Sequence, residues 1–287
     1  MKLAMGEVEA MKKICHPNII QFHESCMEGR SINIIMEHAP YGDLSCMIVQ
    51  AKNKGCYLQE KSLWEYLIQI SEGLEYLHKE KILHRDMKTA NIFLSSSSNS
   101  NNNIKTSAFG QHNNDIPSLK IGDLGVAKML NSTKSYAASV VGTPYYLSPE
   151  LCENRPYNSK SDVWALGCVL YELIMLEHAF KGGNMAALIL NIIRGGYDPL
   201  PKDVNRCSPG LKSLVDKMLQ RDFNNRPSTK EILTTQMVQS EMDKMGITPP
   251  TPVGRKRILP SESNTSPLYH HGLSYIHKSS LTYIVNI

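Results

Sequence analysis

The most apolar stretch of the chain is VWALGCVLYELIML, which occupies residues 163–176. It runs for only 14 residues and contains the ionisable residue Glu172, whereas a helix that spans a bilayer needs about 20 apolar residues. A helix that is apolar on all sides must be enclosed by other elements of a domain. The stretch therefore predicts a buried core helix, and 287 residues suffice for one large domain or two small ones.

Composition narrows the class of protein. Hydrophobic residues make up 41% of the chain and charged residues 20%, which is ordinary for a soluble globular protein. The formal net charge of +4 is modest and no basic stripe accompanies it, so we expect neither nucleic acid nor a membrane as a partner. The seven cysteines include no Cys-x-x-Cys pair. We therefore expect reduced cysteines in a cytoplasmic protein, with the nucleus as an alternative location.

The first part of the chain predicts a helix followed by a β-hairpin. Apolar residues recur at helical spacing from Ala4 to Cys15, with charged residues between them, and Pro17 ends the pattern. Residues 19–26 and 31–40 are rich in β-branched and aliphatic residues and are separated by a turn. The apolar face of the first helix needs a covering element.

The rest of the chain is mostly helical, apart from an insert and a tail. Leucine and isoleucine residues step by four and three from Leu63 to Leu77, which predicts one long helix. Residues 95–103 are all Ser or Asn, and we expect a disordered insert over 95–118 between two strands. A Ser/Thr/Pro-rich tail over 239–287 is also predicted to be disordered. Further helical patterns cover residues 159–176, 184–194, 210–220 and 228–234.

Three motifs follow one another in a fixed order. They are HRDMKTAN at 84–91, DLG at 123–125 and SPE at 148–150. These resemble the catalytic loop H-R-D-x-x-x-x-N, the metal-binding D-F-G and the A-P-E of eukaryotic protein kinases. One such motif would be a weak signal, but three in the right order with helices between them are specific.

The chemistry of phosphoryl transfer explains these residue types. The reaction needs a hydroxyl aligned with the γ-phosphate and neutralisation of the charge on both groups. The resemblance implies that Asp86 accepts the hydroxyl proton and that Lys88 reaches the γ-phosphate of ATP, as in serine/threonine rather than tyrosine kinases. Asn91 completes this catalytic set. Together with Asp123 it supplies oxygen ligands for Mg²⁺.

The resemblance is closest to the NIMA-related (Nek) kinases, over about residues 4–235. It rests on HPNIIQFHES, KILHRDMKTANIFL, VGTPYYLSPELCENRPYNSKSDVWALGCVLYEL and NNRPS. It implies that Met36 is the gatekeeper and that the hinge from Glu37 to Ala39 holds adenine by its backbone. Asp43 then falls near the ribose.

The same resemblance implies several structural roles. Asp162 braces the catalytic loop, Glu150 and Arg226 form an ion pair, and His84 packs in the core instead of taking part in catalysis. Glu7 matches the glutamate of helix αC. Without its lysine partner, it is explained equally well as a solvated helix residue.

Regulation is expected at the activation segment. Arg85 stands beside the catalytic base and attracts an anion, which a phosphate on that segment supplies. Ser139 matches the position at which Nek kinases are phosphorylated, although a plain loop serine explains it as well. Thr143 matches the threonine near the acceptor. Rival phosphorylation sites are Ser132, Thr133 and Ser135.

Two departures from the kinase pattern qualify the expected activity. Leu124 replaces the phenylalanine of D-F-G, a hydrophobic exchange from which we expect little harm. Only six residues precede Glu7, and neither a glycine-rich loop nor a V-A-I-K lysine occurs in the sequence. We therefore expect an N-terminally truncated domain, with a partial N-lobe (helix αC and a hairpin) at 1–38 and a C-lobe at 39–238.

The sequence thus predicts an α+β, kinase-like fold with a mostly helical C-lobe and an incomplete N-lobe. The expected function is a Nek-type transfer of the ATP γ-phosphate to Ser or Thr hydroxyls of proteins, with Mg²⁺. The alternative is a catalytically impaired fragment, or a pseudokinase, that binds and regulates partners. The family resemblance points to cytoskeletal, centrosomal or ciliary partners.

Overall fold

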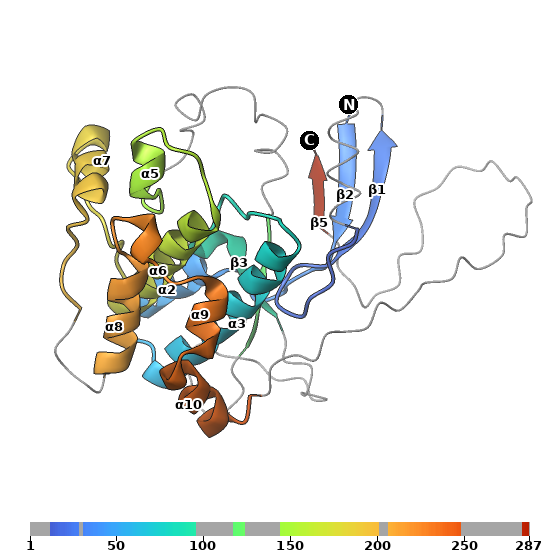
Figure 1. Cartoon of the computed structure of the whole chain (residues 1–287). Helices are drawn as coiled ribbons and strands as arrows, with labels where there is room; N and C mark the ends of the chain where they lie inside the picture. Colours follow the sequence, from blue (N-terminus) through green and yellow to red (C-terminus); the bar gives the residue numbers. More distant parts are fainter. Residues whose placement is uncertain are drawn as a thin grey trace, which may run out of the picture.

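The computed structural model describes residues 12–28, 31–95, 117–123, 144–200, 206–247 and 283–286. Figure 1 shows a helical part and, beside it, a separate sheet of β1, β2 and β5. Most of the predicted first helix and most of the predicted insert lie outside the described residues, as do Glu7, Leu124, Ser139 and Thr143, and the described end of that helix pattern, residues 12–15, is not helical.

The helical part confirms the predicted helices to within a few residues. The long helix predicted from its leucine pattern is α3, and it buries the face from Leu63 to Leu77. Asp43 caps α2 by accepting the N–H of Cys46 at 2.9 Å. The helices are α2 (Leu44–Asn53), α3 (Glu60–Lys79), α5 (Pro149–Cys152), α6 (Ser159–Met175), α7 (Met185–Arg194), α8 (Pro209–Met218), α9 (Thr229–Thr234) and α10 (Gln236–Met245).

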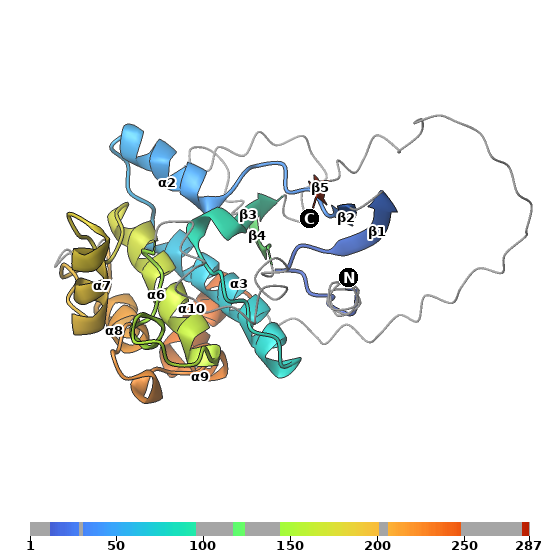
Figure 2. The same cartoon turned by 90° about the horizontal axis from the view of Figure 1, so that it is seen from above.

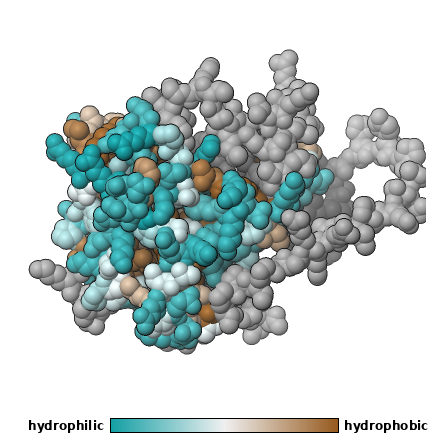
Figure 3. All heavy atoms as spheres, in the orientation of Figure 1, coloured by the Kyte–Doolittle hydropathy of each residue, from teal (hydrophilic) through white to brown (hydrophobic). Residues whose placement is uncertain are grey.

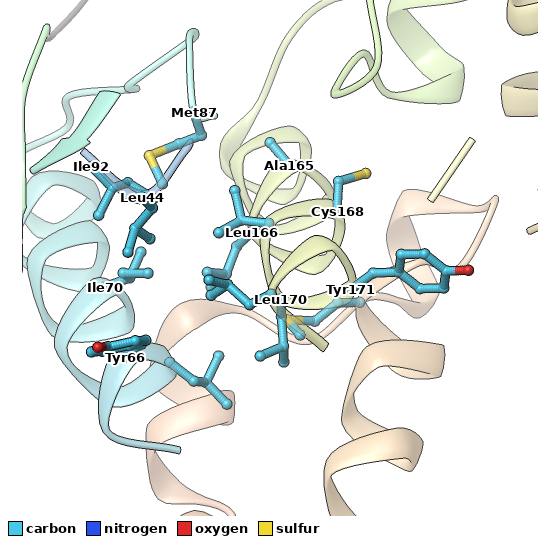
Figure 4. Packing of buried hydrophobic residues seen from close by; sticks show 14 of the residues in the cluster. Leu44, Tyr66, Ile70, Met87, Ile92, Ala165, Leu166, Cys168, Leu170 and Tyr171 are labelled. Carbon is cyan, nitrogen blue, oxygen red and sulfur yellow. The ribbon is translucent and has the colours of Figure 1, made fainter. Parts of the chain in front are cut away.

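Helix α6 is the axis of this part, as its apolar sequence predicted. Every residue from Ser161 to Ile174 is buried, and in Figures 1 and 2 the other helices surround it. Figure 4 shows Leu44, Met87 and Ile92 packed between α3 and α6. A fully buried aliphatic side chain of this kind contributes about 1.5–3 kcal/mol. The catalytic-loop motif is therefore built directly onto the main core.

A small sheet connects the helical part to the N-terminal segment. Strands β3 (Ile92–Ser95) and β4 (Ser118–Ile121) are antiparallel and flank the predicted insert. The segment around Ile19 forms a parallel bridge to Ile121, with Ile20 N–H donating to its carbonyl at 2.8 Å. This bridge attaches the segment that leads into the hairpin to β4 of the small sheet.

The predicted hairpin is confirmed as β1 (Phe22–Glu28) and β2 (Ser31–Met36), which pair in an antiparallel register. A third strand, β5 (Tyr283–Asn286), pairs with the other edge of β2, so that the strand order is β1-β2-β5. The prediction of disorder throughout 239–287 is wrong at two places. Helix α10 continues to Met245, where Gly246 ends it in a left-handed conformation, and residues 283–286 are in β5. Both segments find partners far away in the sequence.

The surface agrees with a domain whose helices turn their apolar faces inward. Figure 3 shows a mostly hydrophilic face, with hydrophobic atoms gathered near α7, where Met185 and Leu190 are exposed. None of the helices in the described ranges has both the length and the apolar character that a bilayer crossing requires.

A buried ion pair joins α5 to the C-terminal half of the chain, as the family resemblance implied. The guanidinium of Arg226 donates to both oxygens of Glu150 at 2.8 Å, and both residues are at most 2% exposed. Ser161 donates a further hydrogen bond to Glu150. Burial alone would raise the pKa of Glu150, but the bonds from Arg226 and Ser161 outweigh it and lower that pKa.

We expect Arg226→Met to reduce the free energy of unfolding by about 3–5 kcal/mol at pH 7, because it leaves the Glu150 carboxylate buried without its partner. The double variant Glu150→Gln/Arg226→Met should lose less, since no unpaired charge remains. Urea unfolding of the three proteins measures this. Equal losses in the single and double variants would contradict the argument.

The same pair predicts a pH dependence. In the native protein the pKa of Glu150 is lowered, so its contribution is present above the unfolded value of about 4.5 and is lost as the pH falls through the lower folded value. In Arg226→Met the buried carboxyl instead becomes protonated, which relieves its cost. The stability gap between the two proteins should therefore shrink from pH 7 to about pH 4.

Candidate active site

The catalytic-loop motif is held by one buried carboxylate of the central helix. Asp162 lies in the first turn of α6 and is 0% exposed. Its oxygens accept the backbone N–H groups of His84 and Arg85, both at 3.1 Å. They also accept hydrogen bonds from Nε2 of His78 on α3, at 2.8 Å, and from the hydroxyl of Tyr157. Asp162 thus ties the loop to two helices.

The ionisation states of this cluster follow from burial and hydrogen bonding. Burial would raise the pKa of Asp162, but the hydrogen bond from His78 counters it and the net pKa is lowered. Burial lowers the pKa of His84. Nδ1 of His84 accepts the N–H of Asp86 at 3.2 Å, so the proton lies on Nε2, which donates to the carbonyl of Gly122 at 3.0 Å. His84 is therefore neutral and links two loops.

Arg85 is held in a conformation that non-glycine residues avoid. Its φ is +66°, in the left-handed region, which costs about 1–3 kcal/mol. The two N–H bonds to Asp162 keep it there. Its guanidinium has no hydrogen-bond or ion-pair partner within the described ranges. Ser139 and Thr143, which the sequence pairs with it in regulation, lie outside those ranges, so these roles stay predictions.

The structure brings the three predicted catalytic residues together. Oδ2 of Asp86 accepts a hydrogen bond from Nζ of Lys88 at 2.8 Å and from Nδ2 of Asn91 at 3.1 Å. Nδ2 of Asn91 also donates to the carbonyl of Asp86 at 2.8 Å. Since the amide nitrogen of Asn91 serves Asp86, its Oδ1 is the atom available to a metal ion.

The second predicted metal ligand lies beside the first. Gly122 N–H donates to the carbonyl of Asn91 at 2.9 Å, and Asp123 is the next residue. Asp123 is exposed and has a φ of +49°. Asn91 directly precedes β3 and Asp123 follows β4. Because the two strands are antiparallel, both residues lie at the same end of the small sheet.

The predicted hinge follows β2 and contacts the same small sheet. Among the described residues, neither the carbonyl of Glu37 nor the N–H of Ala39 has a backbone hydrogen-bond partner, which leaves one acceptor and one donor. This pair matches the hydrogen-bonding edge of adenine. Asp43 forms an antiparallel bridge with Phe93, two residues beyond Asn91. The predicted ribose residue thus lies near the catalytic loop, with its carboxylate also capping α2.

Two polar links were missed by the sequence reasoning. Lys120 on β4 pairs with Oε1 of Glu37 at 2.8 Å and connects the hinge to the strand that precedes Asp123. Tyr146 donates to the buried carboxylate of Glu172 on α6 and lies 2.9 Å from the hydroxyl of Thr89 in the catalytic loop. Both join residues that are far apart in the sequence and carry no local pattern. The sequence held one indication of the second link: Glu172 is an ionisable residue inside the apolar run 163–176, and a buried carboxylate needs a partner.

The donor set suits a nucleotide with Mg²⁺. Asn91 and Asp123 offer two hard oxygen ligands, and Mg²⁺ usually takes one or two protein oxygens together with substrate phosphates. The described residues contain no group of three or more His, Cys, Asp or Glu that would hold a metal by itself. When bound, the ion would neutralise phosphate charge, and these two residues would hold it there.

Comparison with known proteins gives the family. The protein kinase domain family matches residues 1–238. Nek1 of Mus musculus is 41% identical over 238 residues, which cover 83% of this chain. The probable kinase nek3 of Dictyostelium discoideum and Nek8 of Danio rerio are each 42% identical over 80% of this chain. The chain spans only 18%, 19% and 30% of the lengths of these three relatives.

A solved structure supports the fold. The crystal structure of Rad53 1–466 in complex with AMP-PNP matches with a TM-score of 0.66 and 26% identity, over 83% of this chain and 55% of that one. The predicted kinase-like α+β fold is thereby confirmed. The chain belongs to the protein kinase domain family, in which its sequence is similar to the Nek serine/threonine kinases.

Proposed function

We propose that this chain is the phosphotransfer domain of a Nek-type serine/threonine kinase that uses ATP and Mg²⁺. The observation that carries the proposal is the contact between Asp86, Lys88 and Asn91, with Asp123 on the adjoining strand end. A carboxylate, a cation and two oxygen ligands for a divalent ion are the groups that transfer of a γ-phosphate requires.

Each residue has a role that follows from its position. Asp86 orients a Ser or Thr hydroxyl and accepts its proton as the oxygen attacks phosphorus. Lys88, 2.8 Å from Asp86, places its positive charge where the transferred phosphate gains charge. Asn91 holds Asp86 through Nδ2, so that the base keeps its orientation while Oδ1 remains a metal ligand. Asp123 provides the other ligand, and the hinge at Glu37 and Ala39 holds the base of the nucleotide.

Regulation and partners extend the proposal. A phosphate on the activation segment, at Ser139 or near Thr143, would pair with the guanidinium of Arg85 and order that segment against the catalytic loop. Proteins with Ser or Thr acceptors are the substrates. We place the protein in the cytoplasm, with cytoskeletal, centrosomal or ciliary partners, on the similarity to the Nek family.

The second candidate function is a binding module that performs no transfer. It concerns the 287 residues taken by themselves, which contain neither a glycine-rich loop nor a V-A-I-K lysine. These elements normally cover the phosphates and pair with them. The catalytic loop alone would then hold a peptide or a nucleotide without efficient turnover.

A radiolabel assay with a Ser/Thr peptide separates the two functions. For the chain as given we expect turnover far below the usual 1–100 per second of protein kinases. Asp86→Asn should reduce the remaining rate by about 10²–10⁴-fold, because it removes the general base, and should leave nucleotide affinity unchanged. Asp243→Asn on α10, an exposed site away from the loop, is the matched control. Turnover at ordinary kinase rates would exclude the binding module.

Nucleotide binding should depend on the metal through Asp123. We expect Mg²⁺ to strengthen ADP binding to the parent protein in calorimetry and to have little effect on Asp123→Asn, because a neutral amide is a weaker ligand for a hard cation. Without Mg²⁺ the two proteins should bind ADP equally. Failure of the parent protein to bind nucleotide under any condition would overturn the proposed function.

A further inference from the structure

Strand β2 is paired on both edges, and its second partner comes from the far end of the chain. The pairs on that edge are Asn33–Asn286, Ile34–Val285, Ile35–Ile284 and Met36–Tyr283. Figures 1 and 2 both show β5 directly beside β2, separated from β1 by it. The position of β5 at the outer edge means that β2 would be an edge strand without it.

An uncovered edge presents a row of backbone N–H and C=O groups, which readily accept another extended segment. The segment that covers β2 is suited to a strand, since Tyr, Ile and Val are favoured in sheets. Directly opposite residues of an antiparallel pair share a face. In this register Ile34, which is only 2% exposed, is directly opposite Val285.

The covered edge ends at the hinge. Met36, the last residue of β2, pairs with Tyr283, and Glu37 follows at once. Glu37 is fixed by its N–H, which donates to the carbonyl of Gln21 at 2.8 Å, and by its carboxylate, which pairs with Lys120 at 2.8 Å. Lys120 precedes Asp123 by three residues on the strand that leads to it. The end of β2 is thus connected both to the hinge that would hold the adenine and to the strand that leads to the metal ligand Asp123.

We propose that the outer edge of β2 is a strand-docking site whose occupant is residues 283–286 of the same chain, and that this docking holds the hinge in its nucleotide-binding position. The docking itself does not depend on the proposed kinase function. Its effect on nucleotide binding at the hinge does depend on that function. Without β5 the end of β2 would be less ordered. Nucleotide binding would then have to order it, and this loss of conformational entropy would weaken the affinity for the nucleotide.

Hydrogen–deuterium exchange on the full chain tests the docking. Ile284→Pro removes one backbone donor from β5 and prevents regular pairing. We expect the amides of residues 31–36 to exchange about tenfold faster in this variant. Ile276→Pro, the same change outside β5, is the matched control and should not alter them. Adding the synthetic peptide LTYIVNI should restore protection in Ile284→Pro. Equal exchange in both variants would overturn the proposal.

Protein concentration distinguishes the occupant. A strand from the same chain protects β2 equally at every protein concentration, because both partners are in one molecule. If the protection of residues 31–36 grows with concentration and sedimentation shows dimers, the strand comes from a second copy and the intramolecular assignment is wrong.

Calorimetry with Mg–ADP tests the link to the hinge. We expect Ile284→Pro to bind the nucleotide about threefold to tenfold more weakly than the parent and Ile276→Pro to bind as the parent does. Equal affinities in all three proteins would refute the link. If none of them binds nucleotide, the proposed function fails, while the exchange result still decides the docking.

Discussion

The active-site loop depends on the buried carboxylate of Asp162. A carboxylate in an apolar core is strongly unfavourable unless several donors surround it. Here four donors do so, and two of them are consecutive backbone N–H groups, at His84 and Arg85. Leaving the buried Asp162 carboxylate without its donors would cost about 3–5 kcal/mol, which exceeds the strain of about 1–3 kcal/mol at the left-handed Arg85. The loop conformation is therefore a consequence of how one charge of α6 is satisfied.

Helix α6 distributes its few polar side chains in the same way. Ser161 donates to Glu150, which the guanidinium of Arg226 also holds, and Glu172 accepts the hydroxyl of Tyr146. In each case a polar group inside an otherwise apolar helix is paired with a segment outside that helix. The apolar residues of α6 determine where the core lies, and its polar residues determine how the surrounding loops are attached to it.

This division explains how far the sequence could predict the structure. Helical periodicity is local, so α3, α6 and α7 could be predicted within a few residues, and the motif around Asp86 specified the site. Strand pairing is not local. The residues Tyr, Ile and Val of β5 favour a strand, but four residues in a tail rich in Ser, Thr and Pro show no period, and only the pairing with β2 shows where the strand lies. The Lys120–Glu37 ion pair could not be predicted for the same reason, because the two residues are far apart in the sequence and come together only in the folded structure.

Two kinds of contact join the hinge to the catalytic loop, and they differ in strength. The ion pair of Glu37 with Lys120 is partly exposed, with 25% and 14% of the two side chains accessible, so solvent screening limits it to about 1 kcal/mol or less. The backbone contacts are two hydrogen bonds to the buried residue Leu94: its N–H donates to the carbonyl of Gly42 at 2.8 Å, and its carbonyl accepts the N–H of Tyr41 at 3.2 Å. Such bonds allow little displacement without breaking. The segment that follows the hinge is therefore tied by backbone hydrogen bonds to β3, which begins directly after the catalytic loop, and the Glu37–Lys120 ion pair is the weaker of the two connections.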